Sequence, residues 1–207
     1  MTTFYEEMKR CAICGEQNEC VGIASTSEFG SPDLDTRPPE MTRSTIFTWV
    51  ERCWICGYST SDISRASDQT AAIVRSAPYR KQLTDATLPY LANSFLCKAI
   101  LDESVGDYAS AGWAIIHAAW VCDDSEKPES AKECRSRAAD MVLKAIEAGQ
   151  EFTKQRGGEI AILVDLLRRA GRFSEAKELI ARKRDEIKDD IILKVLAFQA
   201  QLITRGD

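Results

Sequence analysis

Two copies of the motif C-x-x-C-G constrain the fold of this chain more than any other feature. They are Cys11-Ala12-Ile13-Cys14-Gly15 and Cys53-Trp54-Ile55-Cys56-Gly57. Two residues between the cysteines let one tight turn present both sulfurs to a single ion, and the glycine that follows tolerates the backbone conformation of such a turn. The segment between the two copies must therefore leave a shared site and return to it.

We predict that these four cysteines, Cys11, Cys14, Cys53 and Cys56, bind one structural Zn²⁺. Four thiolates complete a tetrahedral shell and leave no position for water or substrate. Binding of zinc releases about 10–16 kcal/mol in zinc-finger peptides, enough to drive folding of a small module. The alternative, ordinary buried or redox-active cysteines, is less favoured because a thioredoxin-like pair needs a βαβ setting. Here Ser44–Val50 is β-branched and aromatic and predicts a strand that runs into the second motif.

The remaining four cysteines have simpler interpretations. Cys20 lies six residues after Cys14, and two intact pairs leave it unneeded, so we expect a spare thiol. Cys97, Cys122 and Cys134 fall in helical patterns and are expected to be small packing residues. Because no hydrophobic leader precedes these cysteines, the sequence favours metal binding over disulfides and a cytoplasmic protein over a secreted one.

Composition supports a folded chain without a membrane segment. Apolar residues make up 44% of the 207 residues and charged residues 29%, which excludes disorder. No apolar run approaches the roughly 18 residues of a membrane span.

Charge is uneven along the chain. Residues 1–62 contain five basic and ten acidic residues, whereas residues 63–207 contain 22 of each. Four thiolates around Zn²⁺ would make the first part more negative still. Such a surface repels phosphate backbones, so the sequence argues against nucleic-acid binding, which would require a basic face from the helical part. That face would draw on the following residues: Arg75, Arg80, Lys81, Arg168, Arg169 and Arg172.

The segment between the two motifs is predicted to be a loop, because residues 29–41 are rich in turn formers and charges. Asp33, Asp35, Arg37 and Glu40 in this loop could form a polar recognition edge. The other interpretation, which the residues favour, is that Arg37 pairs with a neighbouring carboxylate and the prolines stiffen the crossing.

From about Ser67 onward the hydrophobic period is that of helices. We expect a short helix before the break at Ala77-Pro78-Tyr79, then one helix after Pro89 and another after Gly106-Asp107. Gly171, Phe173, Ala176 and Ile180 follow 65 residues after Gly106, Tyr108, Ala111 and Ile115, although Lys183 breaks the match to Ala118.

An offset of 65 is roughly two tetratricopeptide repeats of ~34 residues. A degenerate middle unit would then occupy about 129–155, with a long helix that Gly157-Gly158 ends. Ile191, Val195, Phe198 and Leu202 predict a terminal helix that covers the open end of the stack. A generic helical bundle with two similar hairpins is the alternative.

Two further features have ordinary structural interpretations. His117 is the only histidine and is expected to be a hydrogen-bonded core residue, because no second histidine or adjacent nucleophile accompanies it. The charge runs at Arg168-Arg169 and 182–186 are expected to be solvated helix faces.

The chain also resembles a known family. The two C-x-x-C-G motifs, the stretch FGSPDLDTRPPEM, the phrase TWVERCWICGYS and the later AAWVCDD are similar to DUF2225, a family of uncharacterised bacterial proteins that join a zinc ribbon to tetratricopeptide-like helices. Ala12 and Trp54 stand where that family often has proline, which alters the turn without removing a ligand. The resemblance implies a cytoplasmic zinc protein without an established activity.

Together these features predict a mostly helical α+β fold: a zinc ribbon at 1–62, followed by a tetratricopeptide-like domain of antiparallel helices at 63–207. The favoured function is a non-enzymatic interaction protein whose helical scaffold binds a protein or peptide. The alternative is an enzyme with a site between ribbon and helices, which would use Asp33, Asp35 or Glu40 with His117.

Overall fold

The computed structural model describes residues 1–207 and confirms an α+β fold that is mostly helical. A long hairpin of strands β1 (Thr3–Arg10) and β2 (Gln17–Ser25) begins the chain, and a second, very short hairpin joins β3 (Glu51–Arg52) and β4 (Ser59–Thr60). Both pairs are antiparallel. Each C-x-x-C-G motif is the turn of one hairpin.

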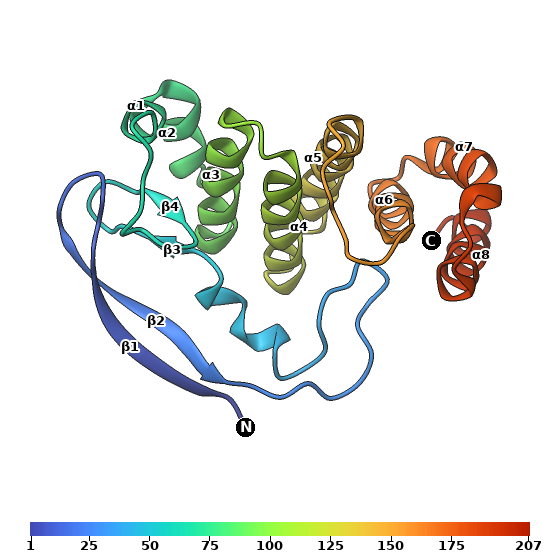
Figure 1. The fold of residues 1–207 in the computed structure, drawn as a ribbon, viewed down its shortest axis with the longest axis horizontal. Coiled ribbons are helices and arrows are strands. Elements are labelled where there is room, and N and C mark those ends of the chain that lie inside the picture. Colours follow the sequence, from blue (N-terminus) through green and yellow to red (C-terminus); the bar gives the residue numbers. More distant parts are fainter.

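Eight α-helices follow the second hairpin. They are α1 (Thr70–Arg75), α2 (Ala77–Leu83), α3 (Tyr90–Ser104), α4 (Tyr108–Asp124), α5 (Pro128–Glu147), α6 (Gly158–Arg169), α7 (Phe173–Lys183) and α8 (Asp190–Arg205). Figure 1 shows α3 to α8 as a row that starts beside the short hairpin and ends at α8. The predicted break at Pro78 is the start of a helix, because proline fits the first turn and Ser76 caps it by accepting from the amide of Tyr79.

Two hydrophobic cores hold the molecule together. The larger core lies among α3 to α8 and also takes in Ile46 and Val50. The smaller core packs Cys11 and Cys53 against buried side chains from both sides of position 62, namely Tyr58, Ile63, Val74, Tyr79, Leu83, Cys97 and Leu101. The two motifs are thus packed directly on α1, α2 and α3.

The strand predicted at Ser44–Val50 is wrong. Most of that segment is a 3-10 helix, η1 (Arg43–Thr48). The chain makes local bonds there: the hydroxyl of Thr45 donates to the carbonyl of Thr42, and that of Thr48 to the carbonyl of Thr45. This turn buries Ile46 in the larger core.

Residues 26–42, which we call the strap, run from the end of β2 across the lower side of the helices and back to η1 (Figure 1). As predicted, residues 29–41 form a loop. An isolated antiparallel bridge between Glu28 and Met41 closes it, with the amide of Phe29 donating to the carbonyl of Glu40 at 2.7 Å.

The two glycine turns 65 residues apart are locally equivalent. Gly106 and Gly171 have φ of +76° and +77°, and each helix that follows starts at the matching aromatic residue, Tyr108 or Phe173. The predicted middle unit differs, because α5 ends at Glu147 and no second helix follows before α6. Gly157-Gly158 therefore starts α6 and does not end α5. The left-handed glycine after α5 is Gly149, with φ of +68°.

The terminal helix α8 exists, but its packed face differs from the predicted one. Ile192, Leu196, Gln199 and Ile203 are buried, whereas Ile191 is 65% exposed and Phe198 49% exposed. The two stripes are one residue apart in sequence and have the same spacing, so periodicity alone did not distinguish them.

Candidate metal centre

The two C-x-x-C-G motifs fold into nearly identical turns. In the first, the amide of Cys11 donates to the carbonyl of Glu16, and the amide of Gly15 donates to the carbonyl of Cys11. The second repeats both bonds, from Cys53 to Tyr58 and from Gly57 to Cys53. Gly15 and Gly57 both have φ of +77°, a left-handed conformation that explains the glycine in each motif.

The turns bring the four predicted cysteines together. Their sulfur atoms all lie within 4.8 Å of one another, with the Sγ of Cys11 at 3.6 Å from that of Cys56 and the Sγ of Cys14 at 3.5 Å from that of Cys53. None of these cysteines is in a disulfide, whose sulfurs would be about 2.05 Å apart.

These distances fit a tetrahedral thiolate site. A tetrahedron with Zn–S bonds of about 2.3 Å has edges of about 3.8 Å, close to the two measured separations. Each hairpin supplies two corners, and the cluster contains no carboxylate or histidine. The four residues can therefore hold one cation in an all-sulfur shell; the identity of that cation stays a prediction.

Asn18 links the two turns. Its side-chain amide nitrogen lies 3.6 Å from the Sγ of Cys53, and its Oδ1 accepts from the amide of Trp54 at 3.1 Å. Asn18 is itself buried. It orients a sulfur of the second turn from a strand of the first hairpin, a role that neither its type nor its position in the sequence indicated.

The surroundings of the thiols shift their pKa values in different directions. Burial raises the pKa of Cys11 and of Cys56. Burial acts the same way on Cys53, but amide donors from Cys56 and Ile55 and the thiol of Cys14 outweigh it and lower the pKa to about 7. Metal binding displaces protons from such thiols, which makes affinity dependent on pH.

Helix α2 holds the second turn in place. The hydroxyl of Tyr79 donates to the carbonyl of Gly57 and accepts from the amide of Ser59, both at 3.0 Å, and this side chain is fully buried. Arg80 donates to the carbonyl of Cys56 at 2.9 Å. The cation site and the first helices are thus one structural unit.

The other cysteines lie outside the cluster. Cys20 is buried in β2 opposite Glu7, and burial raises its pKa to about 11. Cys97, Cys122 and Cys134 are buried in α3, α4 and α5, in agreement with the prediction that they pack.

The four loop residues singled out from the sequence separate into two groups. Asp33 pairs with Arg43 at 2.8 Å, and Glu40 accepts from the hydroxyl of Ser44 at 2.6 Å, both at the exposed surface. Asp35 is 1% exposed and Arg37 is also buried, so neither offers its charge at a surface edge.

Asp35 anchors the strap to the helices. Its Oδ2 accepts from the indole nitrogen of Trp120 at 2.7 Å and from Arg169 at 2.9 Å. Arg37 pairs with Asp124 of α4 at 2.5 Å rather than with a neighbour in the loop.

The ion pairs extend from the strap across three helices. Asp123 of α4 accepts from both Arg135 of α5 and Arg169 of α6. Burial acts to raise the pKa of Asp123, but Arg135 and then Arg169 outweigh it, and the net pKa is lowered. Strap, α4, α5 and α6 therefore share one network of alternating charges.

The prediction that Arg168-Arg169 is a solvated helix face is wrong. Arg168 is buried and pairs with the fully buried Asp165, and Arg169 belongs to the strap network. Arg172 pairs with Asp140 and Glu175. Three of the six arginines and lysines considered for a basic face are therefore neutralised by carboxylates.

His117 lies in an aromatic cluster, without the hydrogen bond expected of it. Its ring centroid is 5.0 Å from those of Trp49 and Trp120, and 5.2 Å from that of Phe95. Burial lowers its pKa to about 3, so the ring is neutral at pH 7. Its ring neighbours are aromatic, and no hydrogen bond or ion pair joins it to Asp33, Asp35 or Glu40.

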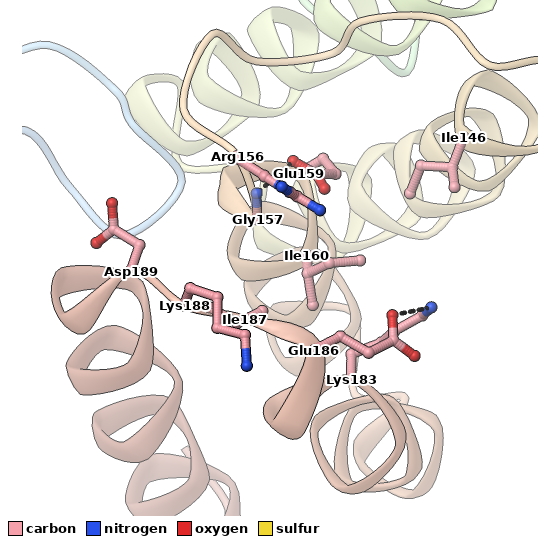
Figure 2. Close-up of a pocket in the computed structure, with 10 residues that line it drawn as sticks. All are labelled: Ile146, Arg156, Gly157, Glu159, Ile160, Lys183, Glu186, Ile187, Lys188 and Asp189. Atoms are coloured by element: carbon pink, nitrogen blue, oxygen red, sulfur yellow. Dashed lines mark hydrogen bonds and ion pairs between the residues drawn. The ribbon is translucent and has the colours of Figure 1, made fainter.

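A cavity of about 450 Å³ opens between the start of α6, the end of α7 and the segment that leads into α8 (Figure 2). Its charged groups are largely engaged with neighbours: Lys183 pairs with Glu186 at 2.7 Å, and Glu159 accepts from the amide of Gly157. This cavity shares no residue with the cysteine cluster or the strap network.

No family model, curated protein or solved structure matches this chain. The resemblance to DUF2225 stays a prediction. None of the helices has the length and apolar character needed to cross a membrane.

Proposed function

We propose that this chain is an interaction protein in which one structural Zn²⁺, held by Cys11, Cys14, Cys53 and Cys56, fixes a ribbon to a tetratricopeptide-like helical scaffold. The observation that carries the proposal is the closed cluster of four sulfurs from two equivalent turns. Such a shell has no open position for substrate, so the ion supports the fold. The matched turns at Gly106 and Gly171 support the repeat interpretation.

The partner we propose is an extended peptide that pairs with the outer edge of β1. This strand pairs only with β2, so its other edge has backbone groups free for a further strand. Phe4, Tyr5 and Met8 of β1 are exposed large apolar side chains, the last by 64%. Glu6 and Glu7 are also exposed. Each face of β1 thus presents apolar and acidic side chains together, so a peptide strand with both apolar and basic side chains complements this edge.

The metal is tested by measuring zinc per chain in purified protein by inductively coupled plasma mass spectrometry. We expect one Zn²⁺ in the parent, and loss of it in Cys14→Ser and Cys53→Ser with retention of much of the helical circular dichroism. Cys20→Ser is the matched control, a buried cysteine outside the cluster, and should keep its zinc. Equal zinc in all four proteins would refute the assignment.

The partner is tested by fluorescence polarisation with two labelled peptides that alternate valine with lysine or valine with glutamate. We expect the lysine peptide to bind more tightly, and Met8→Glu to weaken that binding. Val105→Glu, which changes an exposed apolar residue at the end of α3, should have no effect. Equal binding of both peptides, or identical binding by Met8→Glu and parent, would contradict the β1 site while leaving the metal assignment intact.

A further inference from the structure

The outermost helix of the array, α8, has a second apolar stripe that the rest of the chain covers only in part. Its first stripe packs on α6 and α7. The second consists of Ile191, Val195, Phe198 and Leu202. Ile191 and Phe198 are exposed, whereas Val195 and Leu202 are half-buried, Val195 against the larger core. Terminal units of helical arrays normally present a polar outer face. Here the outer face also exposes two large apolar side chains, Ile191 and Phe198, which favours another element packing there.

The spacing of the open stripe specifies what kind of element fits. The intervals of four, three and four residues repeat the seam of two helices that pack at a shallow angle, with a period of about 3.5 residues. An exposed seam of this kind accepts one helix along its length. Scattered exposed apolar residues, which are ordinary on protein surfaces, have no such spacing.

From this stripe we infer that α8 pairs antiparallel with α8 of a second copy of this chain. A two-fold axis through the middle of the helix places Ile191 opposite Leu202 of the other copy, and Val195 opposite Phe198. The stripe is therefore complementary to itself, as a two-fold interface requires.

Charges at the ends of α8 select the antiparallel arrangement. Asp190 lies at the start of the helix and Arg205 at its end; both are exposed, and neither is in an ion pair within the chain. Antiparallel pairing brings Asp190 of each copy near Arg205 of the other, at both ends of the interface. Parallel pairing would place like charges together, and it would also align the two helix dipoles unfavourably.

The interface is small. Four side chains from each copy bury less surface than the roughly 1,200–2,000 Å² that stable complexes bury. We therefore expect a transient dimer with a dissociation constant on the order of 10 µM.

Sedimentation velocity of the zinc-loaded full chain, from about 1 µM to about 500 µM, tests the inference. We expect the weight-average mass of the parent to rise toward twice the chain mass. Phe198→Glu, at the centre of the stripe, should remain monomeric over this range. Val105→Glu, the matched exposed apolar site just after α3, should behave as the parent. Circular dichroism confirms that the variants fold.

Charge reversal tests the arrangement without altering the apolar stripe. Asp190→Arg and Arg205→Asp should each raise the dissociation constant, by about three- to tenfold for two rim pairs. The double variant restores opposite charges at both ends and should recover the parental constant. A parent that stays monomeric throughout overturns the inference, as does a dimer that survives Phe198→Glu or a double variant no better than the single ones.

Discussion

Asp35 offers the most direct test of how the strap is held. Asp35→Asn keeps the shape of the side chain and removes its charge. The oxygen that accepts from Trp120 and Arg169 can be retained, but the amide nitrogen of asparagine would face the backbone N–H of Arg37, which donates to Oδ1 of Asp35 at 3.3 Å. Arg135, 4.0 Å away, would also lose an opposite charge.

The size of the stability loss in Asp35→Asn follows from the burial of this ion pair. Breaking a buried ion pair by removing one partner costs about 3–5 kcal/mol, because the remaining charge is left without compensation. Asp123 continues to pair with Arg135 and Arg169, so we expect the lower end, about 3 kcal/mol in the free energy of unfolding. For a chain of this size that corresponds to a fall in melting temperature of about 6–12 °C.

The assay is urea unfolding followed by tryptophan fluorescence and circular dichroism, with amide hydrogen exchange of the strap. Asp33→Asn is the matched control, because Asp33 is in the same loop but pairs with Arg43 at the surface, where such a pair contributes about 0–1 kcal/mol. We expect exchange of residues 29–41 to accelerate in Asp35→Asn alone. If the two variants unfold within about 0.5 kcal/mol of each other and exchange at the same rate, the strap network does not anchor the loop.

The remaining predictions concern His117 and the motif glycines. Because the pKa of His117 is about 3 when folded and about 6.5 when unfolded, stability should fall as pH drops below about 6.5. His117→Phe removes this contribution, so parent and variant should diverge by at most about 2 kcal/mol between pH 7 and pH 5 in urea unfolding; parallel profiles would contradict a buried neutral ring. Gly57→Ala should be more destabilising than Gly15→Ala, although both glycines have φ of +77°. A Cβ at Gly57 would lie 2.3 Å from the Cδ2 of Leu83, whereas nothing lies within 4 Å at Gly15. The clash should make Gly57→Ala about 1–3 kcal/mol less stable than backbone strain alone would. Thermal melts of the zinc-loaded variants compare their stabilities, and an equal loss of stability in both would show that backbone strain alone is responsible.

Local patterns determined much of this protein. The C-x-x-C-G motifs specified two turns, and their spacing correctly grouped four of eight cysteines, because the sulfurs of each pair depend on backbone geometry within five residues. Glycine followed by an aromatic residue likewise located the starts of α4 and α7. These features depend on local backbone geometry and not on the position of the rest of the chain.

Only the tertiary structure decided the features that depend on distant neighbours. Ser44–Val50 has strand-forming residues, yet local hydroxyl–carbonyl bonds and the burial of Ile46 in the larger core accompany a 3-10 helix there, η1. The two stripes of α8 have the same spacing, and packing against α6 and α7 chose one of them. Asp35 and Arg169 are 134 residues apart, and the sequence pattern predicted that both charges lie at the surface. Whether a charged side chain is buried depends on which distant segments pack over it, and the local sequence does not show this.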